Sequence, residues 1–282
     1  MQRLLTLLTV LLFSTATPRL EAEVRQCFHL SDVLDTVDAQ TLVIFDIDNT
    51  LIETKQTLGS DQWFNQTLER RLKAGQDFDE ALQEVLNLWW RIIQVSDFRT
   101  VETSTAEVVF EAQERAAAVI GLTSRGPELK EQTHQALRSL DLNLARAPIG
   151  TGFGEVKGFQ GPCYWDGVFF CDGKPKGKVL QTVMDEIRAL GVSKVIFVDD
   201  TARHIHSVEQ LIEGEGLDYL GLRYGVVDER VENFDHRIAD IQLHAFEFVM
   251  SDEMAEALHE NRLEEALEHL IHHLSEKGAI RR

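Results

Sequence analysis

Two short apolar runs in this chain of 282 residues are each followed at once by a pair of carboxylates. Asp46 and Asp48 follow the first run, and Asp199 and Asp200 follow a later one. Carboxylates that lie close together repel one another and cannot all ionise cheaply without a cation. A hard divalent ion with oxygen ligands resolves that conflict, and Mg²⁺ suits an open site shared with phosphate. We therefore predict a Mg²⁺ site with these four aspartates as its ligands.

The spacing within the first pair fits a two-part reaction on a phosphate ester. Asp46 can attack a phosphoryl group, because a carboxylate nucleophile can form an acyl-phosphate, while Asp48 moves a proton. Thr123 and Ser124 follow another apolar run, where hydroxyl and backbone N–H groups can bind phosphate oxygens. Asn49, within the first motif, is a further candidate for binding phosphate.

A nearby lysine is expected to offset the charge on the transferring phosphoryl group. The segment Lys-Pro-Lys-Gly-Lys supplies Lys174, Lys176 and Lys178 just before a predicted helix. Lys176 is favoured as the catalytic lysine, because Lys178 also fits a surface position on that helix. Lys178 is kept as a phosphate-binding candidate and Lys174 ranks third, so the sequence leaves the choice among the three open.

Apolar β-rich runs alternate with helical patterns, which predicts an α/β fold with a doubly wound, Rossmann-like parallel sheet. Ligands of such sheets bind beyond the carboxyl ends of the strands, so the candidate residues are expected to meet at one edge. A helix is predicted over Lys178–Leu190, ending at Gly191. Strands are predicted at Thr41–Phe45, Ala117–Leu122, Val195–Val198 and Tyr219–Leu222.

An insertion of mostly helical pattern, residues 51–116, separates the first two of these strands. It is either an elaborate crossover or a separate helical cap over the site, and its length favours a cap. The α/β core is therefore assigned to residues 23–50 and 117–282. Its last segment carries an apolar stripe from Leu258 to Leu274 and is expected to dock as an amphipathic helix.

Residues 1–22 have the pattern of a signal peptide. Arg3 precedes the apolar run Leu4–Phe13, and small residues follow, including Ala22. The run is too short to span a bilayer comfortably, and a buried N-terminal helix is the alternative interpretation. We expect an exported protein, periplasmic or secreted, with no stable membrane insertion once this segment is removed.

The charge balance is strongly acidic, with 47 Asp and Glu against 28 Lys and Arg. Such a surface repels a phosphate backbone, and the sequence contains no basic groove, so no nucleic-acid partner is expected. The expected partner is a small phosphorylated substrate, because a capped site excludes bulky polymers. The oligomeric state does not follow from the sequence.

Three cysteines are present, Cys27, Cys163 and Cys171. Asp166 and Gly167 form a hairpin-turn signal between the last two. A two-residue turn would place Cys163 opposite Phe170 and the two sulfurs on opposite faces, whereas a three-residue loop would place Cys163 across from Cys171. The sequence leaves a Cys163–Cys171 disulfide open.

Four of these motifs together resemble those of the haloacid dehalogenase (HAD)-like superfamily, whose core is a doubly wound parallel sheet. Residues 45–51, Phe-Asp-Ile-Asp-Asn-Thr-Leu, resemble its first motif, and Leu-Thr-Ser at 122–124 is similar to its second. Lys176 matches the third and Val-Asp-Asp at 198–200 the fourth. The order and the spacings fit, with 77 residues from Asp46 to Thr123, 53 on to Lys176 and 23 on to Asp199.

The resemblance implies a role for each matching residue. Asp46 would be the nucleophile and a metal ligand, and Asp48 the general acid/base, with its backbone carbonyl on the metal. Thr123 would bind phosphate and Lys176 would steady the phosphoryl group. The metal site would be completed by Asp199 and by Asp200, the latter directly or through water.

The expected activity is therefore that of an Mg²⁺-dependent phosphatase acting on a small phosphomonoester through an aspartyl-phosphate. An acid at position 48 points to phosphatase or phosphotransferase chemistry, because dehalogenase branches lack it. A phosphotransferase with a non-water acceptor and a non-catalytic HAD-like binding protein are the alternatives. Residues 59–64, together with the signal segment, also resemble an exported bacterial branch that has no agreed substrate.

Several other residues near the motifs fit more than one role. Arg125 suits a substrate contact or a solvated loop position. His204 and His206 are two apart on a predicted helix, so they point in different directions and are expected to be structural or to border the site. Four aromatic residues of the insertion are expected to be mainly core: Trp63, Phe64, Trp89 and Trp90.

Overall fold

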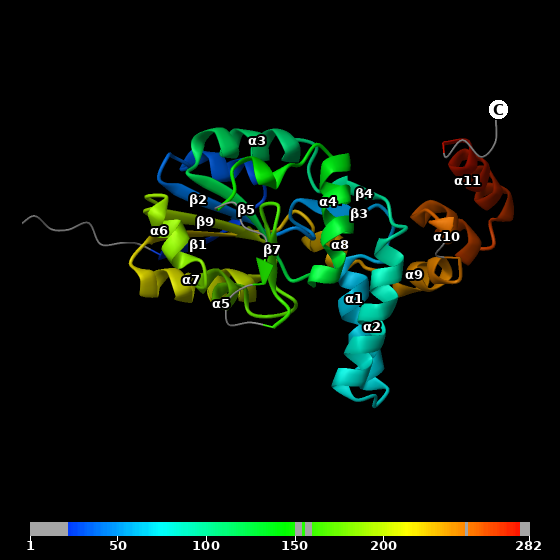
Figure 1. Cartoon of the computed structure of the whole chain (residues 1–282). Coiled ribbons are helices and arrows are strands. Elements are labelled where there is room, and N and C mark those ends of the chain that lie inside the picture. Colours follow the sequence, from blue (N-terminus) through cyan, green and yellow to red (C-terminus); the bar gives the residue numbers. More distant parts are fainter. Residues whose placement is uncertain (1–21, 150–153, 156–159, 246–247, 277–282) are drawn as a thin grey trace, which may run out of the picture.

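The computed structural model describes residues 22–149, 154–155, 160–245 and 248–276 (Figure 1). The predicted signal peptide, residues 1–22, therefore lies outside the described residues except for Ala22, which begins the first strand. None of the helices in the described ranges combines the length and the hydrophobicity needed to cross a bilayer.

Eight of the described strands form one large sheet in the order β1–β10–β9–β2–β5–β8–β7–β6. Neighbours from β1 to β8 run parallel, and β7 and β6 are antiparallel additions at one edge. The predicted α/β fold with a mostly parallel sheet is confirmed, and it is compatible with a Rossmann-like arrangement. The strands are β1 (Ala22–Cys27), β2 (Thr41–Phe45), β5 (Ala118–Thr123), β6 (Gly154–Glu155), β7 (Cys163–Trp165), β8 (Val168–Phe170), β9 (Lys194–Asp199) and β10 (Asp218–Tyr224).

Helices cover both faces of this sheet (Figure 1). Every side chain of β2 is buried, because Val43 packs in the core beneath α3 and Ile44 in the core beneath α5, α6 and α7. Strands buried on both faces have nearly continuous apolar sequences, which is why β2 was predictable. The helices on the sheet are α3 (Thr105–Arg115), α4 (Lys130–Ser139), α5 (Lys176–Gln181), α6 (Met184–Ala189) and α7 (Ala202–Glu215), with the short 3₁₀ helices η1 (Leu30–Asp35), η2 (Pro127–Leu129) and η3 (Leu144–Arg146) in the connections.

Within the predicted insertion, α1 (Asp61–Lys73) and α2 (Phe78–Ile93) form a helical hairpin beside the sheet (Figure 1). A small antiparallel pair, β3 (Ile52–Thr54) and β4 (Phe98–Thr100), lies at its base. The remaining helix of this segment, α3, packs on the sheet rather than in the hairpin.

The last helices, α8 (Asp228–Glu232), α9 (His236–Leu243), α10 (Asp252–His259) and α11 (Leu263–Glu276), follow β10. In Figure 1, α9, α10 and α11 lie beyond the hairpin, away from the sheet. The segment before α1 is tied to them by two backbone N–H groups: that of Thr57 donates to Asp252 Oδ1 at 2.7 Å, and that of Leu58 to Gln242 Oε1 at 2.8 Å. The base of the hairpin thus depends on residues 195 and 184 positions further along the chain.

The expected docking of the C-terminal stripe is wrong for most of α11. Leu263, Leu267 and Ile271 are 68%, 55% and 45% exposed, and Ala266 is the residue of this helix that is buried. Asn261 adopts a left-handed conformation, with φ at 59°, and breaks the predicted continuous helix into α10 and α11. The apolar residues from Leu258 to Leu274 therefore do not lie along one helix face that packs on a single surface.

The helix predicted over Lys178–Leu190 is interrupted as well. It divides into α5 and α6 at Thr182, whose hydroxyl donates to the carbonyl of Val179 at 2.7 Å. A threonine hydroxyl that bonds a nearby backbone carbonyl competes with regular helix geometry. Gly191 ends the segment as predicted, with φ at 75°.

The three cysteines are free thiols. Asp166 and Gly167 form a two-residue turn, with both φ angles positive, and Cys163 pairs with Phe170 across the hairpin. Of the two registers considered, the one that separates the sulfurs is the one adopted. A disulfide between Cys163 and Cys171 is therefore excluded in this fold.

We predict slow modification of all three thiols in the native protein. Burial raises the pKa of Cys27 and of Cys171 to about 12 and also raises the pKa of the half-buried Cys163. Because the thiolate is the reactive form, iodoacetamide at pH 8 should label Cys163 first and the other two only on unfolding. Mass spectrometry of the labelled peptides measures this order. Fewer than three titratable thiols in denaturant without reductant would contradict the assignment.

Candidate functional site

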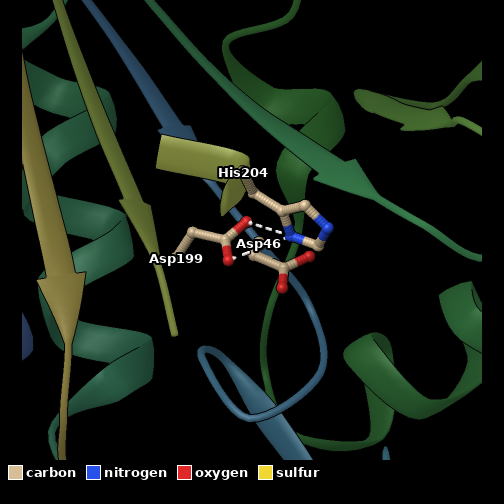
Figure 2. A group of neighbouring side chains, drawn as sticks. All are labelled: Asp46, Asp199 and His204. Atoms are coloured by element: carbon tan, nitrogen blue, oxygen red, sulfur yellow. Dashed lines mark hydrogen bonds and ion pairs between the residues drawn. The ribbon is translucent and has the colours of Figure 1, made fainter. Parts of the chain in front are cut away.

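The three central strands bring the predicted motifs to one edge of the sheet. β2 lies between β5 and β9, with Phe45 in register with Gly121 on one side and Val198 on the other. Asp46 follows Phe45, and its backbone N–H still donates to the carbonyl of Val198, at 2.9 Å. Asp46 thus emerges beside Asp199, as Figure 2 shows. Parallel strands in register make the carboxyl-end loops neighbours, as predicted.

Lys176 bridges the two aspartates. Its Nζ lies 2.6 Å from Asp46 Oδ1 and 2.7 Å from Asp199 Oδ2, and its side chain is fully buried. The next residue, Gly177, allows α5 to approach α7 closely, since a Cβ there would lie 2.0 Å from the backbone oxygen of Ser207. Of the three candidate lysines, Lys176 is the one the fold inserts between the carboxylates.

His204, from the first turn of α7, joins this group (Figure 2). Its Nδ1 lies 3.1 and 3.2 Å from the two carboxylate oxygens of Asp199, and a ligand atom from each of Asp46, Asp199 and His204 lies within 4.8 Å of the others. His206 is exposed and pairs with Glu209, so the two histidines point in different directions as expected. The sequence signal that relates His204 to the site is its position in the first helical turn after the fourth motif.

Burial and mutual repulsion set the protonation of the cluster. Burial raises the pKa of Asp46 well above its usual value, against the attraction of Lys176 and with the help of Asp199. Burial also acts to raise the pKa of Asp199, but Lys176 and His204 outweigh it and the net pKa is lowered. The pKa of Asp200 rises to about 7 through burial and the negative charge of Asp199. One buried ammonium therefore does not neutralise the group.

A fifth carboxylate, Asp61, approaches from the hairpin. It stands in the first turn of α1, directly after the N-cap Ser60, and burial and the charge of Asp48 raise its pKa to about 6. An acidic residue at this helix position is normally explained by the helix dipole alone, so the sequence contained no specific signal for its role here.

Several of these side chains could hold a divalent cation. Asp46, Asp199 and Asp200 offer carboxylate oxygens, the ligands that Mg²⁺ prefers. The pKa values of Asp46 and Asp200 are raised by burial and in part by the negative charge of Asp199, which is the repulsion that a cation would relieve. His204 is engaged with Asp199, which suits the support of a ligand rather than direct binding of a hard ion.

Arg125 holds the second aspartate of the first motif. Its Nε donates to Asp48 Oδ2 at 2.8 Å and its Nη2 to Asp48 Oδ1 at 2.6 Å, while Nη1 donates to Thr133 Oγ1 at 2.8 Å. The residue is 2% exposed, so the solvated loop interpretation of Arg125 is wrong. Its guanidinium also lies 5.5 Å from the ring centre of Trp89. The backbone N–H of Arg125 donates to Thr123 Oγ1 at 3.2 Å, so the chain bends directly after β5, and the Arg125 side chain reaches Asp48.

These groups open into a cavity of about 520 Å³ between the sheet edge and the hairpin. The structure brings Thr123 and Ser124 to it, the first buried and the second exposed. It does not bring Asn49 or Lys178 there: the Asn49 amide donates to Asp200 Oδ2 at 3.3 Å and lines a neighbouring cavity of about 340 Å³, and Lys178 is exposed on α5. The predicted site residues that line the larger cavity are Asp46, Asp48, Thr123, Ser124, Lys176 and Asp200.

Replacing Lys176 with Met should reduce the free energy of unfolding by about 3–5 kcal/mol at pH 8, because it leaves two buried carboxylates without their cation. The deficit should shrink toward pH 5. In the variant, a buried carboxyl group of the native state takes up a proton as the pH falls, while the same group in the unfolded chain is still ionised. Urea unfolding at several pH values measures both effects. Lys178→Met, an exposed change on the same helix, is the control, and equal losses in the two variants would contradict the assignment.

Comparison with known proteins gives a family without an assigned chemistry. The model of a family described as "protein of unknown function (DUF2608)" matches residues 26–256. A relative from Chlamydia pneumoniae, named "putative outer membrane protein", is 24% identical over 271 residues, which cover 92% of this chain and 97% of the relative. A relative of the same name from Chlamydia trachomatis serovar D is 25% identical over 236 residues, 83% of this chain and 87% of the relative. No solved structure matches the chain. The family match spans most of the chain and includes the acidic cluster, so the chain belongs to the DUF2608 family.

Proposed function

We propose that this chain is an exported, Mg²⁺-dependent phosphohydrolase that cleaves a small phosphomonoester through an aspartyl-phosphate on Asp46. The observation that carries the proposal is the buried Lys176 between Asp46 and Asp199, at the floor of a cavity also lined by Thr123 and Asp48. Residues from four separate segments thus meet where a phosphoryl group could be attacked, held and neutralised. The resemblance of the same segments to the HAD-like motifs supports the same reaction.

The proposed reaction has two displacements at phosphorus. In the first, a carboxylate oxygen of Asp46 attacks phosphorus, the bond from phosphorus to the leaving oxygen breaks, and Asp48 donates a proton to that oxygen. In the second, Asp48 removes a proton from water, whose oxygen attacks the aspartyl-phosphate and releases inorganic phosphate and Asp46. Lys176 and the Thr123 hydroxyl are the groups available to hold phosphoryl oxygens.

Asp46, Asp199, Asp200 and the backbone carbonyl of Asp48 are the groups that would hold Mg²⁺. When bound, the ion would offset the charge that these carboxylates and the phosphoryl oxygens share. The helices α1 and α2 would act as a cap, since residues from both line the cavity opposite the sheet edge.

The proposed location is the cell envelope or beyond. The apolar run Leu4–Phe13 after Arg3 supports export, and relatives named as outer membrane proteins agree with it. The periplasm and the medium are both compatible with the sequence pattern.

The proposal predicts phosphate release from phosphomonoesters that requires Mg²⁺ and Asp46. Asp46→Asn should lower kcat by about 10³-fold or more, because it removes the nucleophile while keeping its shape. The measurement is phosphate release across a panel of esters, with Mg²⁺ or with chelator. Asp185→Asn, a fully exposed change on α6, is the control. If wild type and Asp46→Asn were equally inert across the panel while Mg²⁺ still bound, the proposed activity would be rejected.

Arg125 is predicted to position Asp48 for proton transfer. Arg125→Lys keeps the positive charge but loses the two-point contact, so kcat for alkyl phosphates should fall roughly 10- to 100-fold. The loss should be smaller for p-nitrophenyl phosphate, whose leaving group needs no proton. Arg146→Lys, at a surface ion pair, is the matched control. An equal loss for both classes of ester would show a merely structural role.

A further inference from the structure

The helical hairpin presents carbon rather than polar atoms to much of the catalytic cavity. Leu82, Leu86 and Trp89 of α2 line it at spacings of four and three residues, which place them on one face of the helix, and Phe64 of α1 lines it beside them. The rings of Phe64 and Trp89 meet edge to face, with centres 5.5 Å apart. We call these four side chains the apolar wall.

Core packing accounts for the two aromatic residues of the apolar wall, since Trp89 lies in an apolar core cluster and Phe64 packs against it, but it does not account for the two leucines. Trp89 is 8% exposed, and its indole N–H already donates to the carbonyl of Gly59 at 2.7 Å, so the ring offers no unpaired polar atom to the cavity. Leu82 and Leu86 are half-buried and, among the described residues, belong to none of the apolar core clusters. Large aliphatic side chains held at a cavity surface without core partners are available to a ligand.

Two polar side chains of α1 that face the cavity are already paired with each other. On α1, the amide of Asn65 donates to Asp61 Oδ2 at 2.7 Å, and both residues line the cavity. If the leaving group were rich in hydroxyls, several of these hydroxyls would face the carbon atoms of Leu86 and Phe64. Each hydroxyl left without a hydrogen-bond partner would weaken binding. An apolar leaving group would instead remove that carbon surface from water.

The charged residues at the sheet edge, Asp46 and Lys176, determine how a substrate would be oriented. Asp46 and Lys176 require the phosphoryl group at the sheet edge, which directs the rest of a monoester toward α1 and α2. A cavity of about 520 Å³ accepts a leaving group of ring size beside the phosphoryl group. Arg125 contacts both the charged and the apolar side of the cavity: it is paired with Asp48, and its guanidinium lies 5.5 Å from the centre of the Trp89 ring.

From this geometry we infer that the apolar wall is the leaving-group subsite and that the substrates are phosphomonoesters of apolar alcohols, cyclic or branched, rather than of sugars. The inference rests on the proposed phosphohydrolase function for the reaction itself. The wall would determine which ester is turned over, and the groups around Asp46 would carry out the same chemistry on each.

The test compares ethyl phosphate with cyclohexylmethyl phosphate, two alkyl esters whose leaving alcohols have similar acidity. The full-length protein with Mg²⁺ should prefer the larger ester in kcat/KM by about 10-fold or more. Leu86→Asn, which keeps the size of the side chain but makes it polar, should bring the ratio of the two kcat/KM values close to one. Leu263→Asn, the same change at an exposed leucine on α11, should leave that ratio as in wild type.

A second arm separates this inference from the reaction. Calorimetric titration of Asp46→Asn with each ester, in the presence of Mg²⁺, should show tighter binding of cyclohexylmethyl phosphate, and Leu86→Asn added to that variant should remove the difference. If no ester is turned over by wild type while this binding preference holds, the proposed hydrolysis fails and the subsite stands. The subsite would be overturned if both esters were turned over with equal kcat/KM, if Asp46→Asn bound both equally, or if Leu86→Asn kept the wild-type ratio.

Discussion

The contact on which the rest of the site depends is the buried ammonium of Lys176 between Asp46 and Asp199. Without it, the carboxyl ends of β2 and β9 would carry adjacent, largely buried negative charges. A buried charge is tolerated when it is paired and hydrogen-bonded, and here one cation serves two carboxylates from different strands. The close approach of α5 to α7 at Gly177 follows from the same requirement, since it brings the lysine to this position.

The strands that carry the site could be predicted because their residues are buried on both faces. Thr41–Phe45 was predicted with the bounds it has, and the later strands differ by one or two residues at their ends. β1 was missed because it is an edge strand that exposes four of its six side chains, so no apolar pattern identifies it. The break at Thr182 was missed because a hydroxyl that bonds its own backbone does not disturb hydrophobic periodicity.

The part of the candidate site that could be predicted from the sequence is the set of residues whose type and spacing identify them. Asp46, Asp199 and Lys176 follow predictable strands or precede a predictable helix, so their meeting point follows from topology. Arg125 and His204 could not be assigned in the same way, because a loop arginine or a helical histidine has the same sequence appearance whether it faces solvent or a carboxylate. Their roles depend on side-chain direction, which only the folded neighbours determine.

The ties between the base of the hairpin and the C-terminal helices affect the order in which the molecule can be completed. The backbone N–H groups of Thr57 and Leu58 obtain their acceptors from Asp252 and Gln242, near the end of the chain. A chain that emerges from its N-terminus forms α1 and α2 long before these acceptors arrive, and closing so long a loop is slow compared with forming a helix. The wall of the cavity is therefore held in its final position only after nearly the whole chain has been synthesised and has passed any membrane it crosses. Completion of the cavity, as distinct from the cluster around Lys176, is therefore expected late in the folding of the protein.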